Sequence, residues 1–214
     1  MSDIIGQQIK KISVGISNRH IHLSAKEKDI LFGAGYMLSY MKSLSQTGQF
    51  AARETVTIVG TKGSIENVRI LGPERKQTQV EVSRTDMYKL GINAPVRDSG
   101  DLEGTPGIIV IGPGGMVSLR KGVICAKRHI HMNHEDASAF NVAERQEVMV
   151  KTSGERGTIF SNVLIRVDDS FVLELHLDTD EANAACLGNN DKVEICVAAI
   201  VDRHYTYLQD NAQQ

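Results

Sequence analysis

The chain has few cysteines and no long apolar segment. Its 214 residues contain three cysteines, Cys125, Cys186 and Cys196, an odd number without a CxxC pair. This pattern excludes a disulfide framework and favours a reducing compartment. No run approaches the roughly 20 apolar residues of a membrane span, and the N-terminus lacks the apolar core and cleavage site of a secretory signal. We therefore expect a cytoplasmic protein with no membrane partner.

The sequence also lacks a strong charge of either sign and several common catalytic motifs. Lys and Arg number 24, and Asp and Glu number 26, so the net charge is -2. No basic field predicts a nucleic-acid partner. The chain has no P-loop, no GxGxxG after a strand, no GxSxG elbow and no HExxH. A substrate that carries a nucleotide would therefore be held by something other than a Rossmann site.

An internal duplication is the main feature that the chain does contain. The tetrapeptide Arg-His-Ile-His occurs twice, once in each half of the sequence. Three pairs of segments follow the same order in both copies: 19–22 and 128–131, 54–70 and 147–165, 80–86 and 173–180. Each copy has the pattern of a His-x-His segment, a short helix, a hairpin with a Gly-bearing turn and a closing strand. Repeated order of this kind predicts two similar structural units.

Short strands and closely spaced Gly turns predict a mainly β fold with two similar small β-barrel domains, each with short α-helices. Ser24 and Asn133 are expected to be the N-caps of matching helices. The first copy is longer than the second, and its extra residues fall within 26–50. The pattern leaves open that a strand crosses between the halves. The expected boundaries are an N-terminal extension 1–12, a first barrel 13–112, a second barrel 113–200 and a C-terminal tail 201–214.

The doubled His-x-His pairs predict two metal sites. Alternation along a strand places both imidazoles of each pair on one face, where they can hold one divalent metal, zinc most often. The repeat supplies a third ligand, because Glu81 follows Asn67 at the same spacing at which His176 follows Asn162. Cobalt or iron would suit the same donors. The two expected groups are His20, His22 and Glu81, and His129, His131 and His176. Three ligands leave an open coordination position, which favours catalysis.

Basic residues precede Glu81 in the stretch NVRILGPERKQTQVEVSRTD. Guanidinium groups suit bidentate binding of phosphate, and Arg75 follows a Gly-Pro-Glu turn from which it could reach a metal-bound anion. Lys62 and Lys42 are candidates for a more distant phosphate. By contrast, strand alternation places Arg19 and Arg128 on the face opposite the histidines, so we expect them to form structural ion pairs.

With these residues identified, the chain resembles the phosphate propanoyltransferase family, the phosphotransacylases of bacterial microcompartments. The resemblance rests on GISNRHIHLS, NVRILGPERKQTQVEVSRTD, the Gly-Thr-Pro-Gly turn, KRHIHM and LELHLDTDEANAA, and it covers about residues 14–198. It implies two β-barrel domains with a site between them that holds two Zn²⁺ ions on the six ligands above. The activity it implies is interconversion of a short acyl-CoA (propanoyl-CoA or acetyl-CoA) and phosphate with acyl phosphate and CoA.

The same resemblance implies roles for further residues. Arg75 would bind phosphate and act in catalysis, and Tyr88 would stack on adenine. CoA contacts would fall on Ile16, Ser17, Asn18, Lys62, Arg69 and Asn183. Shell or cargo proteins of a microcompartment are implied partners, which would place the protein in the microcompartment lumen as well as the cytoplasm. The sequence leaves the oligomeric state open, a homo-oligomer included.

Two other functions remain compatible with the same residues. The first is a zinc-dependent thioester or amide hydrolase, in which water replaces phosphate; the arginine cluster argues against it. The second is a metal-stabilised structural protein of a shell, which closed four-ligand sites would favour. Two open metal groups without an activated Ser or Cys nucleophile instead predict direct acyl transfer to phosphate.

Overall fold

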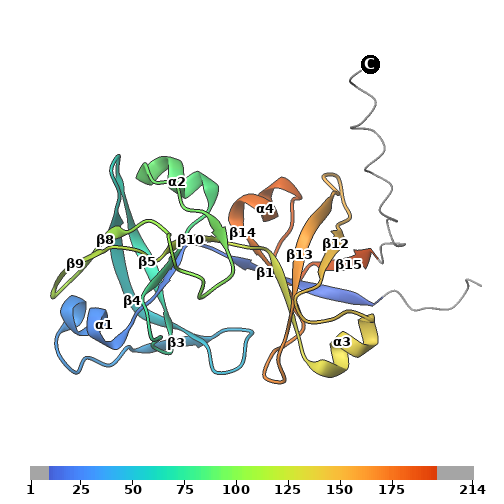
Figure 1. Cartoon of the computed structure of the whole chain (residues 1–214), viewed down its shortest axis with the longest axis horizontal. Helices are drawn as coiled ribbons and strands as arrows, with labels where there is room; N and C mark the ends of the chain where they lie inside the picture. Colours follow the sequence, from blue (N-terminus) through green and yellow to red (C-terminus); the bar gives the residue numbers. More distant parts are fainter. Residues whose placement is uncertain (1–9, 197–214) are drawn as a thin grey trace, which may run out of the picture.

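The computed structural model describes residues 10–196. The expected C-terminal tail and most of the expected N-terminal extension lie outside these residues. Within them, 15 strands and four helices form two β structures side by side (Figure 1). None of the helices in the described part of the chain has the length and apolar character to cross a membrane.

The first half is a curled sheet of nine strands, in which β3 pairs with β4 beside the main path β7-β10-β6-β2-β5-β4-β8-β9. Its core includes the fully buried side chains of Ile21, Ile58 and Leu90. Helices α1 (Ala25–Phe32) and α2 (Arg84–Leu90) belong to this half. Its strands are β2 (His20–His22), β3 (Tyr40–Ser43), β4 (Phe50–Val59), β5 (Ser64–Gly72), β6 (Gln79–Glu81), β7 (Val96–Arg97), β8 (Ile108–Gly112), β9 (Gly115–Leu119) and β10 (Val123–Ala126).

The second half is a closed barrel of six strands in the order β1-β14-β11-β13-β12-β15. Its separate core includes Ile12, Ile130 and Leu175. Helices α3 (His134–Phe140) and α4 (Thr179–Ala184) flank it. Its strands are β1 (Lys11–Ser17), β11 (His129–Met132), β12 (Glu147–Lys151), β13 (Ile159–Val167), β14 (Glu174–Asp178) and β15 (Lys192–Cys196). The expectation of a mainly β fold with two barrel-like domains is confirmed.

Strand pairing repeats the duplication residue by residue. β2 runs parallel to β5 and antiparallel to β6, and β11 runs parallel to β13 and antiparallel to β14. The expected hairpins are present as β4–β5 and β12–β13. Asn67 and Asn162, the residues that set the repeat register, both have positive φ, 57° and 55°. Asn tolerates this left-handed region better than most residues, which accounts for its use at the same irregular point of both hairpins.

The two halves exchange their leading strands, which corrects the expected domain boundaries. β1 precedes β2 in sequence but joins the second barrel, where it pairs with β14 and β15. β10 precedes β11 but joins the first sheet, where it pairs with β6 and β7. Division at residues 112–113 therefore places β1, β9 and β10 in the wrong half. Each repeat begins in one half and crosses to the other just before its His-x-His pair.

The helices begin at N-cap residues, two of which were expected from the sequence. The side chains of Ser24 and Asn133 accept from the backbone N–H groups of Glu27 and Asp136, so both expected N-caps are confirmed. α2 and α4 begin with matching capping boxes, formed by Ser83 with Asp86 and by Asp178 with Glu181. These four caps fix where the chain leaves the strands that carry the candidate ligands.

The extra residues of the first copy form an arm toward the second half. They include β3 and the turn 44–49 that joins it to β4. Figure 1 shows this turn, in light blue, extending from the first sheet toward the other half. Gln46 is 4% exposed and bonds with the backbone of Val172, just before β14: its amide nitrogen donates to the carbonyl at 3.1 Å, and its amide oxygen accepts from the N–H at 3.1 Å. The arm is therefore an inter-half contact.

Candidate functional site

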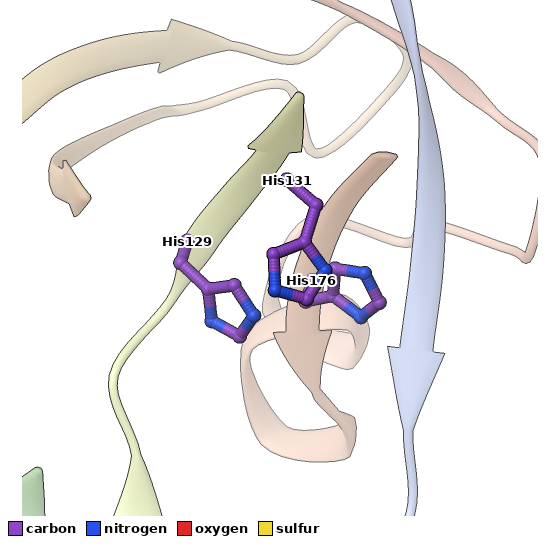
Figure 2. A group of neighbouring side chains, drawn as sticks. All are labelled: His129, His131 and His176. Atoms are coloured by element: carbon purple, nitrogen blue, oxygen red, sulfur yellow. The ribbon is translucent and has the colours of Figure 1, made fainter. Parts of the chain in front are cut away.

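The structure gathers the six predicted ligands into two compact groups. In each group, donor atoms of the three side chains lie within 4.8 Å of one another. The cross-strand register accounts for this, because His20 faces Glu81 across β2 and β6, and His129 faces His176 across β11 and β14. Figure 2 shows the second group, with His129 and His131 projecting from one strand and their rings close to that of His176. The spacing in the sequence therefore identified side chains that the fold brings together.

The crossing points between halves orient one histidine in each group. His20 Nδ1 lies 2.8 Å from the carbonyl oxygen of Asn18, and His129 Nδ1 lies 2.8 Å from that of Lys127. A hydrogen bond from Nδ1 to the carbonyl leaves Nε2 as the ring nitrogen available for a metal. The same two segments, 18–19 and 127–128, carry the chain from one sheet to the other. The strand exchange thus also positions ligands.

Burial keeps most of these imidazoles neutral. It is the main cause that lowers the pKa of His22 to about 3, of His131 to about 2, and of His129 and His176 to about 4. Neighbouring imidazoles lower the pKa further in His22, His129 and His131. Because a metal binds only the neutral ring, these four side chains are in the required protonation state at neutral pH.

Glu81 makes the first group different. Burial alone would raise the pKa of Glu81, but His20, whose Nε2 lies 3.5 Å from Oε2, and the Arg75 guanidinium hold it well below its usual range. In turn, burial would lower the pKa of His20, but Glu81 raises it above its usual value. The carboxylate is therefore ionised at neutral pH and supplies the negative charge of the first group.

The donor sets fit a divalent metal. Among the described residues, no hydrogen-bond partner is present for the buried Nδ1 of His22 or for either ring nitrogen of His131. A buried polar atom without a partner is costly, and a metal ion would satisfy it. Two imidazoles with a carboxylate, and three imidazoles, are donor sets found at catalytic zinc sites. The residues present therefore fit two metals, with the metal's identity left to experiment.

Both groups face one cleft between the halves, with a volume of about 860 Å³. Its lining contains two carboxylates, Glu81 of the first group and Glu174 beside the second, and several basic side chains. The basic residues on its wall are Arg19, Lys42, Arg69, Arg75 and Arg166. A cleft that combines metal-ligand groups with cations suits a polyanionic substrate.

Arg75 is held beside the first group. Its Nη1 donates to Ser99 Oγ at 2.9 Å, and Ser99 Oγ also accepts from Gln79 Nε2 at 2.9 Å. Burial lowers the pKa of the Arg75 guanidinium, with Glu81 opposing and Arg166 adding to this effect. A guanidinium in proteins nonetheless remains charged. Arg75 is therefore a fixed cation within the cleft that contains both ligand groups.

The residues implied for CoA binding divide into two sets. Ile16, Ser17, Asn18 and Arg69 line the cleft, with the Arg69 guanidinium also donating to backbone carbonyls of β4. The cleft wall does not include Lys62 or Asn183, both exposed. Lys62 lies at the β4–β5 turn against the end of α2, where its backbone N–H donates to the carbonyl of Leu90. Their contact with CoA remains a prediction, and Lys42 on the arm is the lysine that lines the cleft.

The remaining predicted residues make their own contacts outside the ligand groups. Tyr88 is 75% exposed on α2, and the Arg84 guanidinium lies 5.9 Å from its ring centre. The expected structural pairs are confirmed: Arg19 Nε lies 2.7 Å from Asp86, and Arg128 Nε lies 2.9 Å from Glu181. Both acidic partners occupy the third position of a capped helix, so each pair ties a His-x-His strand to the helix beside it.

Sequence reasoning missed several side chains around the ligands. Gln79 Nε2 donates to Glu81 Oε1 at 2.6 Å, and Glu174 Oε2 lies 3.1 Å from His176 Nε2. Gln79 and Glu174 follow the register asparagine of their own repeat at equal spacing, so extending the repeat comparison by one step would have found them. Ser99 and the arm residues Ser45 and Gln46 have no such signal, because they belong to loops, and Arg166 has none because the matching residue of the first copy is Leu71.

Comparison with known proteins agrees with this geometry. The sequence profile of the family described as phosphate propanoyltransferase matches residues 13–188. A phosphate propanoyltransferase of Thermotoga maritima is 60% identical, over 86% of this chain and 88% of that protein. Those of Rhodopseudomonas palustris and Salmonella typhimurium are each 52% identical, over 87% and 84% of this chain and 82% and 86% of theirs.

The matched residues include both strand-exchange segments and both ligand groups, so the likeness covers the centre of the candidate site and most of the described fold. An identity of half or more over this length, together with the profile match, shows that the chain belongs to the phosphate propanoyltransferase family.

Proposed function

We propose that the chain transfers a short acyl group between coenzyme A and phosphate, interconverting propanoyl-CoA or acetyl-CoA and phosphate with acyl phosphate and CoA. The observation that carries the proposal is the single cleft that contains two three-ligand groups and the held guanidinium of Arg75. Family membership supports the same reaction class.

In the forward direction, an oxygen of phosphate forms a bond to the thioester carbonyl carbon. The carbon–sulfur bond breaks, and the thiolate of CoA leaves with the electron pair and then takes up a proton. Arg75 binds and orients the phosphate, and Ser99 keeps the guanidinium in place. Holding phosphate next to the carbonyl removes much of the entropic barrier of the two-substrate step.

His20, His22 and Glu81 would hold one zinc ion, and His129, His131 and His176 would hold a second. Bound zinc would supply Lewis-acid polarisation of the carbonyl oxygen or of the leaving thiolate, and cobalt or iron would do so with the same donors. The chain's own contribution is to keep the four imidazoles other than that of His20 neutral by burial and to keep the Glu81 carboxylate ionised by its pairing with His20.

The rest of the cleft has the charge expected for a binding site for CoA, whose phosphates are anionic. Arg69 and Lys42 lie on its wall, and Ser17 and Asn18 line it just before the first histidine of the first group. Tyr88, Lys62 and Asn183 would contact CoA only where the ligand extends beyond the cleft. Association with microcompartment shell or cargo proteins and self-association stay predictions without a structural argument from the described residues.

The test is thiol release from propanoyl-CoA by the purified protein, with and without phosphate, before and after chelation and after return of zinc. We expect release that requires phosphate, is lost on chelation and returns with zinc. Equal release without phosphate would favour a thioester hydrolase. Phosphate-dependent release that survives complete metal removal would contradict the metal part of the proposal.

A further inference from the structure

We propose that Glu174 is a positioning residue for His176, and that it plays in the second ligand group the part that Gln79 plays in the first. This inference rests on the proposed two-metal function. It is carried by a correspondence between the two halves that involves the ligand, the residue two positions before it, and a serine from a loop.

In the first half, Gln79 fixes the orientation of the Glu81 carboxylate. Gln79 is 1% exposed, and its Nε2 donates to Glu81 Oε1 at 2.6 Å and to Ser99 Oγ at 2.9 Å. Its Oε1 accepts from the backbone N–H of Gly100 at 2.8 Å. With Glu81 Oε1 occupied in this way, Oε2 is the carboxylate oxygen that lies 3.5 Å from His20 Nε2. Gln79 therefore selects which oxygen of Glu81 faces the ligand group.

In the second half, Glu174 occupies the same register. Gln79 faces His22 across β2 and β6, and Glu174 faces His131 across β11 and β14. Glu174 is 8% exposed, and its Oε2 lies 3.1 Å from His176 Nε2. The hydroxyl of Ser45 donates to the same oxygen, so a loop serine contacts each of the two residues.

In each half the third ligand and its neighbour form a donor–acceptor pair. The carboxylate is the ligand in the first half and the neighbour in the second. An amide donor accompanies the carboxylate ligand Glu81, and a carboxylate acceptor accompanies the imidazole ligand His176. A second partner of the opposite hydrogen-bonding character is what a ligand needs to hold one ring or carboxylate orientation. The third ligand and its neighbour thus differ together between the halves, as expected if the neighbour acts on the ligand.

Glu174 occupies a space built to hold it. A Cβ added at Gly15, which faces His176 across β1 and β14, would lie 2.6 Å from Glu174 Cδ. On another side, the arm supplies Ser45 and the buried Gln46, whose amide nitrogen lies 3.4 Å from His176 Nε2. Strand β1 and the arm both come from the N-terminal part of the chain, so this part encloses Glu174 beside the second group.

Positioning fits the distances better than direct ligation. The three donors of the second group lie within 4.8 Å of one another, and that mutual set contains His129, His131 and His176 without Glu174. Glu174 instead contacts the ring of one ligand. Carboxylates that contact a ligating histidine commonly orient it, and their loss weakens metal affinity by about 10- to 100-fold.

The experiment measures zinc affinity of the full-length chain by competition with a chromophoric chelator. The variant Glu174→Gln is compared with wild type, each also in a Glu81→Ala background, which leaves the second group as the main zinc site. Glu66→Gln, an exposed carboxylate on β5, is the matched control. The melting temperature of the zinc-free proteins shows whether the substitutions disturb the fold.

We expect Glu174→Gln to weaken zinc binding at the second group by about 10- to 100-fold, with the first group and zinc-free melting unchanged. Unchanged affinity, or equal weakening at both groups, would overturn the proposal. Complete loss of the second zinc, equal to that in His176→Ala, would make Glu174 a ligand and would also overturn it. A wild-type chain that binds no zinc would instead contradict the proposed two-metal function.

Ser45→Ala provides a second test that keeps Glu174 and does not touch the core. Removing the hydroxyl frees one oxygen of Glu174, so we expect a smaller loss of affinity, below about 10-fold, confined to the second group. If Glu174→Gln does not fold, a lack of any effect in Ser45→Ala counts against the proposal.

Discussion

The first and second halves bring corresponding positions into the same register, but the residue types at two of these positions differ. Each has a His-x-His strand, a third ligand opposite the first histidine, and a neighbour opposite the second. The first half supplies the carboxylate as the ligand and an amide as its neighbour, whereas the second supplies an imidazole and a carboxylate. Arg75 precedes Glu81 in the first copy, and Ser170 holds the matching position before His176 in the second. The two copies thus share the register of the candidate ligands, whereas the Arg75 guanidinium has no counterpart at the matching position of the second copy.

The largest effect is expected from the residue that the second half lacks. Arg75→Ala should lower the rate of phosphate-dependent thiol release by about 10²-fold or more, because the fixed positive charge beside the attacking phosphate is lost, as when an oxyanion donor is removed. The measurement is kcat at saturating phosphate. Lys76→Ala, the neighbouring exposed cation, is the control. A rate equal to wild type would exclude Arg75 from the reaction.

Loss of one third ligand should empty one group and spare the other. Glu81→Ala should retain one bound metal per chain, and His176→Ala should also retain one, because each group has its own three donors. Elemental analysis after dialysis counts the metal. If both metals stay bound in Glu81→Ala, the assignment of the first group is wrong.

The reversed pairs can be exchanged between the halves. Glu81→His alone should bind metal in the first group weakly, since Gln79 presents a donor where the new imidazole needs an acceptor. The double variant Gln79→Glu with Glu81→His copies the second half and should recover about 10-fold of the lost affinity. Chelator competition measures both variants. Equal affinity of the single and double variants would indicate that the neighbour has no influence on its ligand.

The smallest expected difference concerns the two arginines that precede the histidines. The Asp86 side chain is 3% exposed and that of Glu181 is 21% exposed. Arg19→Ala leaves a buried charge without its partner and should lower the free energy of unfolding by about 2 kcal/mol. Arg128→Ala leaves a better solvated carboxylate and should cost about 1 kcal/mol or less. Urea denaturation of the zinc-loaded proteins compares them, and a larger loss in Arg128→Ala would reverse the ranking.

The ligand groups could be predicted from sequence because they depend on local alternation and on repeat register. His20 and His22 share a face whichever strand they pair with, and Glu81 and His176 follow from their distance to Asn67 and Asn162. The neighbours Gln79 and Glu174 obey the same spacing, but an amide and an acid on a strand carry no signal until their partners are known.

The strand exchange could not be predicted, because a repeat in sequence does not say which sheet a strand joins. The pairing of β1 with β14 links segments near opposite ends of the described chain, and it depends on the packing of the whole barrel. Which lysine lines the cleft could not be predicted for the same reason. Lys62 lies on a turn tip, and its sequence does not say what the tip faces, whereas the arm that carries Lys42 is the segment that reaches the cleft.

The exchanged strands also set an order of events during synthesis. β1 leaves the ribosome first, but its partners β14 and β15 are made last. The second barrel therefore cannot close until nearly all of the chain is available, and long-range closure of this kind is slow. The second ligand group needs His176 on β14, so it is assembled late, whereas the first group lies on β2 and β6 of a sheet whose last strand, β10, ends at Ala126. The two groups are therefore completed at different times, and under the two-metal proposal the second would be the later one to load.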